Sequence, residues 1–159
     1  MFSEIYKLKE LSAKLGNDLS LIQASGGNTS IKLDGKLLVK ASGKKLKNAL
    51  NEDIFVSLDL IKIRNELAIN KSKKELNFKN ICGSSLRASI ETSLHAIMPY
   101  KVVLHTHSVD TIAITLLSNS YNYLNELMKD INWKFIPYFK PGITLAKAIS
   151  KELKDSPSN

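Results

Sequence analysis

The sequence contains two histidines separated by one residue, in the segment 105–107 (His-Thr-His). They follow the apolar run at residues 102–104, which is typical of a strand. Residues two apart on a strand project to the same face, so the rings of His105 and His107 are expected to lie together. Two imidazoles on one face begin a zinc site, and a catalytic zinc usually takes three protein ligands. The pattern predicts a metal site, although two core histidines with polar partners would share this spacing.

A carboxylate and a third histidine precede this pair on an expected helix. Glu91 lies near the start of that helix, where the helix dipole stabilises negative charge. Beside a metal, Glu91 could remove a proton from a carbon next to a carbonyl, and the metal would stabilise the resulting enediolate. A capping or surface role for Glu91 is the alternative. His95 is four residues further on and shares the helix face. It is either a ligand or outer partner of the metal site, or a core histidine bonded to the backbone.

Three polar elements are candidates for binding an anion. Two are glycine-containing turns at strand ends, where exposed N–H groups can surround a phosphate, and the third is a serine at a helix start. The candidate residues are Asn28, Ser42, Gly43 and Ser89. Lys40 and Lys44 could add positive charge, but the sequence does not fix their positions. Together with the metal candidates, these residues predict a phosphate pocket.

The chain pattern mixes helices with strands that are neighbours in sequence. A hairpin is expected over residues 31–39 around Asp34-Gly35. Apolar spacing predicts helices over residues 4–15 (ending at Gly16), 90–98, 109–118, 121–129 and 145–153, and strands over 54–63, 101–107 and 133–139. Residues 64–80 are polar and predict an exposed hairpin or loop. This pattern favours an α/β fold whose sheet is at least partly antiparallel.

Composition limits the class of protein. The chain has 159 residues, 43% of them hydrophobic, which suggests one domain with a real core. Its single cysteine, Cys82, excludes an intrachain disulfide and favours a reducing, cytoplasmic setting. No apolar run is long enough to span a membrane, and no signal-peptide pattern is present. The formal charge is +8, but the lysines are dispersed among polar residues, which argues against nucleic-acid binding.

In order and spacing, the motifs together resemble those of the class II aldolase/adducin family from about residue 4 to about residue 150. The matching segments are residues 25–30, 41–43, 89–95, 105–107 and 136–142. The resemblance implies a three-layer α/β/α fold with a central, largely antiparallel sheet. It also implies a homo-oligomer, usually a tetramer.

The resemblance further implies chemistry for individual residues. His105 and His107 would bind Zn²⁺ or another divalent metal, and Glu91 would be the acid/base. The four anion-binding candidates match the phosphate positions of the family. Many relatives cleave phosphorylated sugars by retro-aldol chemistry, so we expect a metal-dependent lyase. Related pentulose-phosphate epimerases, methylthioribulose-phosphate dehydratases and non-catalytic, adducin-like interaction modules are the alternatives.

Two departures from the family pattern stand out. Ile90 replaces the second phosphate-site serine and leaves only the backbone there. The family also supplies a third metal histidine downstream, but this sequence has three histidines and none follows His107. The chain stops at Asn159, about where that segment should begin. We therefore expect one domain, residues 1–159, incomplete at its C-terminal end, with Glu91, His95 or another subunit completing the site.

Overall fold

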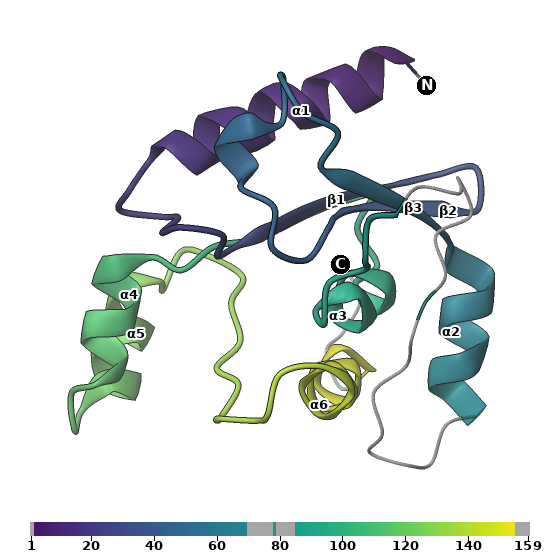
Figure 1. Ribbon diagram of the computed structural model, residues 1–159. Coiled ribbons are helices and arrows are strands. Elements are labelled where there is room, and N and C mark those ends of the chain that lie inside the picture. The colour runs from purple at the N-terminus through teal and green to yellow at the C-terminus, as the bar shows by residue number, and fades with distance from the viewer. Residues whose placement is uncertain (1, 70–77, 79–84, 155–159) are drawn as a thin grey trace.

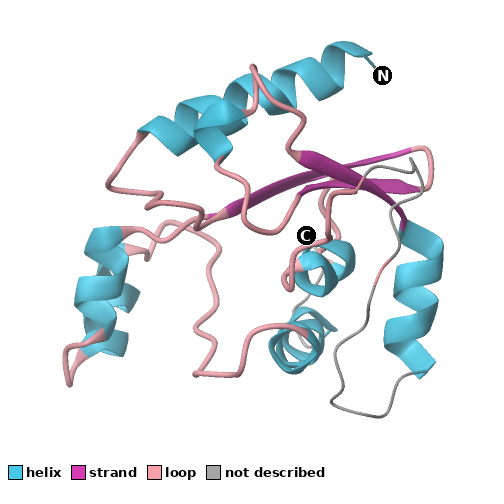
Figure 2. Ribbon diagram, in the orientation of Figure 1, coloured by secondary structure: helices cyan, strands magenta, loops and turns pink. Residues whose placement is uncertain are grey.

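A four-stranded antiparallel sheet, in the order β3-β2-β1-β4, lies between two layers of helices (Figures 1 and 2). The computed structural model describes residues 2–69, 78 and 85–154. The elements are α1 (Phe2–Asn17), β1 (Asn28–Leu33), β2 (Lys36–Lys40), the short 3₁₀ helix η1 (Leu46–Asn48), β3 (Phe55–Asp59), α2 (Leu60–Ile69), α3 (Thr92–Ile97), β4 (Val102–His105), α4 (Val109–Thr115), α5 (Ser120–Leu127) and α6 (Ile143–Lys154). Helix α1 covers one face of the sheet, and α2, α3 and α6 cover the other. The expected three-layer α/β/α fold with an antiparallel sheet is confirmed.

The β1-β2 hairpin forms where the sequence predicts it. Asp34 and Gly35 have positive φ angles of 48° and 74°, which the two central residues of a type I′ turn require. The other edge of β1 pairs with β4, so that Asn28 lies opposite His105. This register brings the first glycine-containing turn next to the histidine segment.

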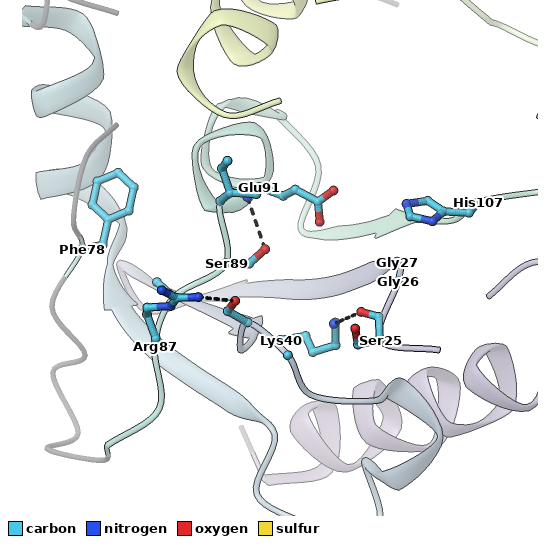
Figure 3. A pocket seen from close by; sticks show the side chains of 13 residues that line it. Ser25, Gly26, Gly27, Lys40, Phe78, Arg87, Ser89, Glu91 and His107 are labelled. Atoms are coloured by element: carbon cyan, nitrogen blue, oxygen red, sulfur yellow. Dashed lines mark hydrogen bonds between the residues drawn. The ribbon is translucent and has the colours of Figure 1, made fainter. Parts of the chain in front are cut away.

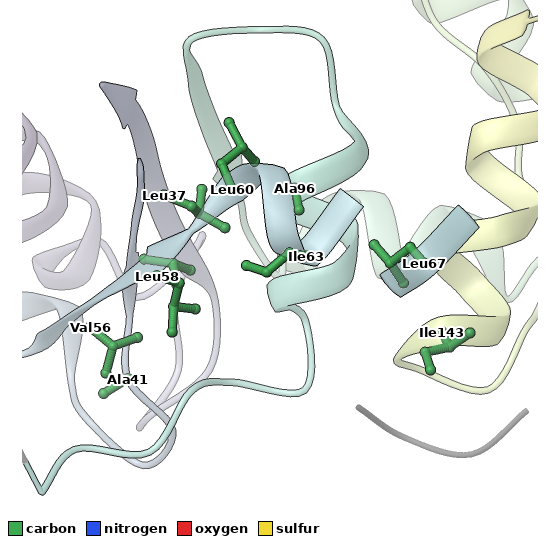
Figure 4. Packing of buried hydrophobic residues seen from close by; sticks show 10 residues of the cluster. Leu37, Ala41, Val56, Leu58, Leu60, Ile63, Leu67, Ala96 and Ile143 are labelled. Carbon is green, nitrogen blue, oxygen red and sulfur yellow. The ribbon is translucent and has the colours of Figure 1, made fainter. Parts of the chain in front are cut away.

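Apolar side chains on the two faces of the sheet form two separate cores. On one face, Leu37, Val39, Val56 and Leu58 pack with the buried residues of α2, α3 and α6 (Figure 4). On the other, Ile31 and Phe55 pack with Leu8 and Ala13 of α1 and with Leu46 of η1. Burying each such aliphatic side chain contributes about 1.5–3 kcal/mol. Both faces of the sheet are therefore held firmly, and its ends provide a rigid base for a site.

The expectation of a strand over residues 54–63 is wrong in its second half. Strand β3 ends at Asp59 and helix α2 begins at Leu60. The Asp59 side chain explains the change, because its Oδ1 accepts a hydrogen bond of 2.8 Å from the Lys62 N–H and so caps the helix. Residues 64–69 continue α2 instead of forming a loop. The rest of the expected 64–80 loop lies outside the described residues, apart from Phe78.

Gly16 does not end the first helix, which continues to Asn17. Gly16 is buried, and a Cβ at this position would lie 2.1 Å from the Lys47 backbone nitrogen. The glycine therefore serves the close approach of α1 to η1, which local sequence does not reveal.

The region after β4 matches the predictions in part. Helices α4, α5 and α6 appear close to their expected positions, and Pro141-Gly142 is a turn. The strand expected over residues 133–139 is absent from the described structure, where this segment is a loop (Figure 2). No described strand pairs with it, and its side chains Phe135 and Tyr138 are exposed. Among the described helices, none combines the length and the apolar character needed to cross a membrane.

Candidate functional site

Glu91, His105 and His107 converge at the end of β4. Each offers one ligand atom, and the three atoms lie within 4.8 Å of one another. His105 is the last residue of the strand and His107 lies just beyond it, with ring centroids 4.9 Å apart. Glu91 immediately precedes α3, which begins at Thr92 and not at residue 90 as expected. The structure thus brings together the three residues that the sequence singled out for metal and acid/base roles.

The donor atoms of this cluster suit a divalent cation. His105 Nδ1 lies 2.8 Å from Glu91 Oε1. This nitrogen is buried, and the Glu91 oxygen is its close polar neighbour, although their contact does not have hydrogen-bond geometry. Two imidazole nitrogens and a carboxylate oxygen are a donor set that zinc accepts, so the residues present fit the metal that the family implies.

The loop before β1 holds His107 in place. The His107 N–H donates to the Leu21 carbonyl over 2.8 Å, and the Gln23 side-chain amide donates to the His107 carbonyl over 3.3 Å. Gly26 lies against the ring, where an added Cβ would be 2.8 Å from His107 Nδ1. The first glycine-containing turn therefore admits the His107 ring, a role not expected from the sequence.

We expect Gly26→Ala to displace His107 and to weaken zinc binding by about 10–100-fold, the loss typical when the support of a metal ligand is removed. The fold should persist, because the added methyl meets the His107 ring and the Gln23 carbonyl at the surface and not either core. Zinc titration followed by calorimetry measures the effect, with far-ultraviolet circular dichroism as the control for folding. A variant with wild-type zinc affinity would contradict this role for Gly26.

His95 belongs to the core and not to the cluster. The side chain is fully buried, and its Nδ1 forms a 2.7 Å hydrogen bond with the Ser30 hydroxyl. Burial lowers the pKa of His95 to about 4, so the ring is neutral at neutral pH. The core position was one of the two alternatives, but the partner is a side chain instead of the expected backbone.

The Glu91 carboxylate is ionised at neutral pH. Burial alone would raise the pKa of Glu91, but the neighbouring His105 and Asn28 outweigh burial and lower it. The Asn28 side-chain amide lies 3.4 Å from Glu91 Oε2 and also 3.4 Å from the Lys40 carbonyl. Asn28 is 1% exposed, and the described lining of the pocket does not include it. Asn28 therefore contacts the carboxylate from outside the described pocket lining, whereas the sequence analysis placed it among the phosphate ligands.

An open pocket of about 650 Å³ adjoins the cluster (Figure 3). Its walls come from the two glycine-containing turns and from the segment that leads into α3. The described residues that line it are Ser25, Gly26, Gly27, Lys40, Ser42, Gly43, Phe78, Arg87, Ala88, Ser89, Ile90, Glu91 and His107. Three of the four predicted phosphate-binding residues are thus in one pocket with Glu91 and His107. Ser89 is not at the start of a helix as expected; its hydroxyl accepts a 3.3 Å hydrogen bond from the Glu91 N–H.

The basic residues near the pocket differ in availability. Lys40 is 3% exposed, and its amine donates to the carbonyls of Ser25 and Lys44. Burial lowers the pKa of Lys40, and Glu91 opposes that shift. The Lys44 amine pairs with Glu52 at 3.4 Å. Arg87, which the sequence analysis did not consider, lines the pocket and donates from Nη2 to the Ser42 hydroxyl over 3.1 Å. Its position two residues before Ser89 is the sequence feature that could have indicated a place in the pocket.

Comparison with known proteins agrees with this architecture. The model of the family described as "Class II Aldolase and Adducin N-terminal domain" matches residues 7–159. The chain belongs to this family.

Two curated relatives are similar over much of the chain. One is the "Uncharacterized oxidoreductase YuxG" of Bacillus subtilis (strain 168), 31% identical in an alignment of 157 residues that covers 90% of this chain and 22% of the relative. The other is a "Probable methylthioribulose-1-phosphate dehydratase" of Dictyostelium discoideum, 28% identical in an alignment of 126 residues that covers 74% of this chain and 51% of the relative. The chain thus spans about half or less of the length of these two relatives.

Two solved structures are also similar. The N-terminal class II aldolase domain of a conserved protein from Thermoplasma acidophilum has a TM-score of 0.77 and 27% identity, covering 93% of this chain and 74% of its own. The L-fuculose-1-phosphate aldolase from Thermus thermophilus has a TM-score of 0.52 and 18% identity, covering 73% of this chain and 52% of its own. The second likeness concerns the fold alone.

Proposed function

We propose that this chain is a metal-dependent lyase that cleaves a phosphorylated sugar by retro-aldol chemistry. The observation that carries the proposal is the convergence of Glu91, His105 and His107 beside a pocket rich in hydrogen-bond donors, which Glu91 and His107 line. A metal ion beside a carboxylate can promote proton transfer at a carbon next to a carbonyl, and the hydrogen-bond donors can bind an anionic group. Family membership supports the proposal, because the relatives include a probable dehydratase of a sugar phosphate.

His105 and His107 would hold the divalent cation, with Zn²⁺ the first candidate for two imidazole ligands. When bound, such an ion stabilises negative charge that develops on a carbonyl oxygen. Glu91 is close enough to contribute an oxygen or to act as a base. The carboxylate is ionised and already lies 2.8 Å from His105 Nδ1, which suits either use.

Glu91 is proposed to move the proton at the reacting centre. In the retro-aldol direction, a carboxylate accepts the hydroxyl proton as the carbon–carbon bond breaks, and the carbanion fragment is then protonated at carbon. The lowered pKa of Glu91 keeps it in the accepting form before the reaction. Asn28 limits the motion of the carboxylate by its contact with Oε2.

Ser42, Gly43 and Ser89 are proposed to bind the phosphate group. Gly43 has a φ angle of 75°, and nothing lies within 4 Å of where its Cβ would be, so a ligand can approach its backbone. Ile90 also lines the pocket, but its side chain cannot hydrogen-bond, so only its backbone could contact the phosphate. A substrate held by its phosphate would place its carbon chain toward Glu91 and His107.

The direct test is proton exchange in deuterated water. Protein loaded with zinc is mixed with dihydroxyacetone phosphate, and loss of the proton next to the carbonyl is followed by nuclear magnetic resonance. We expect zinc-dependent exchange that fails with unphosphorylated dihydroxyacetone at the same concentration. Absence of exchange under all metal conditions would reject this chemistry.

Dehydration of a phosphorylated thiosugar is the second candidate, favoured by the Dictyostelium relative. Dehydration also begins by removing a proton next to a carbonyl, but it ends with loss of water and not with two fragments. Product analysis by mass spectrometry separates them, and nuclear magnetic resonance identifies an epimer, which has the same mass as the substrate. An adducin-like interaction module would bind a partner without exchanging any proton.

We also propose a homo-oligomer in the cytoplasm. The exposed apolar side chains of α4 and α5, such as Ile112, Tyr121 and Leu127, support an assembly that covers them.

A further inference from the structure

We propose that Arg87 is the cationic residue that binds the anionic end of the substrate and sets the preference for phosphorylated over neutral sugars. The inference rests on the proposed function, because it concerns the same pocket. It adds a residue that the family resemblance did not supply.

The backbone fixes Arg87 beside the second glycine-containing turn. Ala88 forms an isolated antiparallel bridge with Ala41, and the Ser42 N–H donates to the Arg87 carbonyl over 2.9 Å. The guanidinium then reaches the Ser42 hydroxyl, 3.1 Å from Nη2. Because backbone and side chain are both tied to this turn, the arginine is positioned before any ligand arrives.

Arg87 has more unused and more accessible donors than the other lining cation. Among the described residues that line the pocket, Lys40 and Arg87 are the two with permanently basic side chains. The Lys40 amine has three N–H groups, is nearly buried and already donates to two carbonyls. Arg87 is exposed and has five N–H groups in a planar fork that matches two phosphate oxygens.

Neighbouring hydroxyl groups are oriented to assist. The Ser42 oxygen accepts from Arg87, and the Ser89 oxygen accepts from the Glu91 N–H. Each hydroxyl hydrogen is therefore free to point to a ligand. An oxyanion between Arg87, Ser42 and Ser89 would receive donors from all three.

The position of Arg87 also gives the pocket a direction. Figure 3 shows Arg87 and Phe78 at one end, His107 at the other and the Glu91 carboxylate between them. A phosphate bound at Arg87 leaves the remaining length of the pocket for a short carbon chain that reaches the acid/base and the histidines.

The experiment measures binding of inorganic phosphate by calorimetry to the full chain and to Arg87→Ala, Arg87→Lys and Arg87→Gln. Arg87→Ala and Arg87→Gln should weaken phosphate binding by about 10–100-fold, the loss typical of a charge-assisted hydrogen bond. Arg87→Lys should fall between, because it keeps the charge but loses the fork. Lys45→Ala removes one charge from an exposed side chain that is not among the described lining residues and should bind like the wild type.

Arg87→Gln separates ligand binding from support of Ser42. Glutamine keeps a polar side chain but is shorter than arginine and carries no charge. A purely structural role therefore predicts equal phosphate binding by Arg87→Gln and Arg87→Lys, whereas a role for the charge predicts tighter binding by Arg87→Lys. Zinc affinity should be the same in all Arg87 variants, since the guanidinium does not contact the cluster. Equal phosphate binding by the wild type, Arg87→Ala and Arg87→Gln overturns the inference.

The outcome is independent of the reaction assigned to the protein. Phosphate binding that depends on Arg87 supports the inference even if proton exchange is never observed, which would reject the lyase alone. Proton exchange by a wild-type chain that binds no inorganic phosphate overturns the inference and leaves the Glu91 chemistry standing.

Discussion

Replacing Glu91 with glutamine is expected to reduce the rate of proton exchange by about 10²–10⁴-fold, the usual contribution of a general acid–base group. Glutamine has nearly the same shape and can remain beside His105 and Asn28, but its amide cannot accept the substrate proton. The measurement is the exchange rate of dihydroxyacetone phosphate in deuterated water, with zinc in excess so that any weaker metal affinity is compensated.

Glu52→Gln is the matched control. Glu52 is exposed, bonds to Lys44 and Asn48, and is not among the described lining residues, so the same chemical change there should leave the exchange rate as in the wild type. Phosphate binding by Glu91→Gln should remain, because the carboxylate is not among the residues proposed to bind the phosphate. If Glu91→Gln exchanges the proton at the wild-type rate, Glu91 is not the acid/base.

Removing either clustered histidine is expected to weaken zinc binding by at least about 100-fold, more than the loss for a supporting residue. His105→Ala and His107→Ala each leave one imidazole and one carboxylate, which cannot complete a tetrahedral site. Zinc stabilises a protein that binds it only when folded, so the wild type should unfold at a higher temperature with zinc, and both variants should lose this rise.

His95→Asn provides the contrast within the same chain. His95 is buried and bonded to Ser30, outside the cluster, so its replacement should lower the unfolding temperature without zinc. The rise on adding zinc should persist, because no ligand has been removed. If His95→Asn loses the zinc effect and His105→Ala keeps it, the ligands have been assigned wrongly.

Local patterns in the sequence were sufficient for much of the fold. The β1-β2 hairpin follows from alternation and from the positive φ angles that Asp34 and Gly35 tolerate. The hairpin depends on neighbours in sequence, which is why it could be predicted. The spacing of His105 and His107 also predicts correctly that the rings lie together, but His107 lies beyond the end of β4 and is held there by Leu21 and Gln23.

Features that depend on distant contacts could not be predicted. The start of α2 at Leu60 is an exception, because the Asp59 cap is a local signal that the sequence analysis missed. The sequence predicts Gly16 as a helix end, but the glycine is needed because the Lys47 backbone, 31 residues along the chain, leaves no room for a side chain. The place of Arg87 in the pocket could not be predicted, because the pairing of Ala88 with Ala41 brings it beside Ser42.

The central claim is that His105 and His107 hold one divalent cation beside the Glu91 carboxylate. The most direct measurement is an anomalous difference map from crystals of the protein grown with zinc, recorded at the zinc absorption edge. The account predicts a peak about 2.0–2.2 Å from one nitrogen of each histidine ring. A well-ordered pocket with no peak between these rings, or a zinc ion bound elsewhere while the rings remain empty, would contradict it.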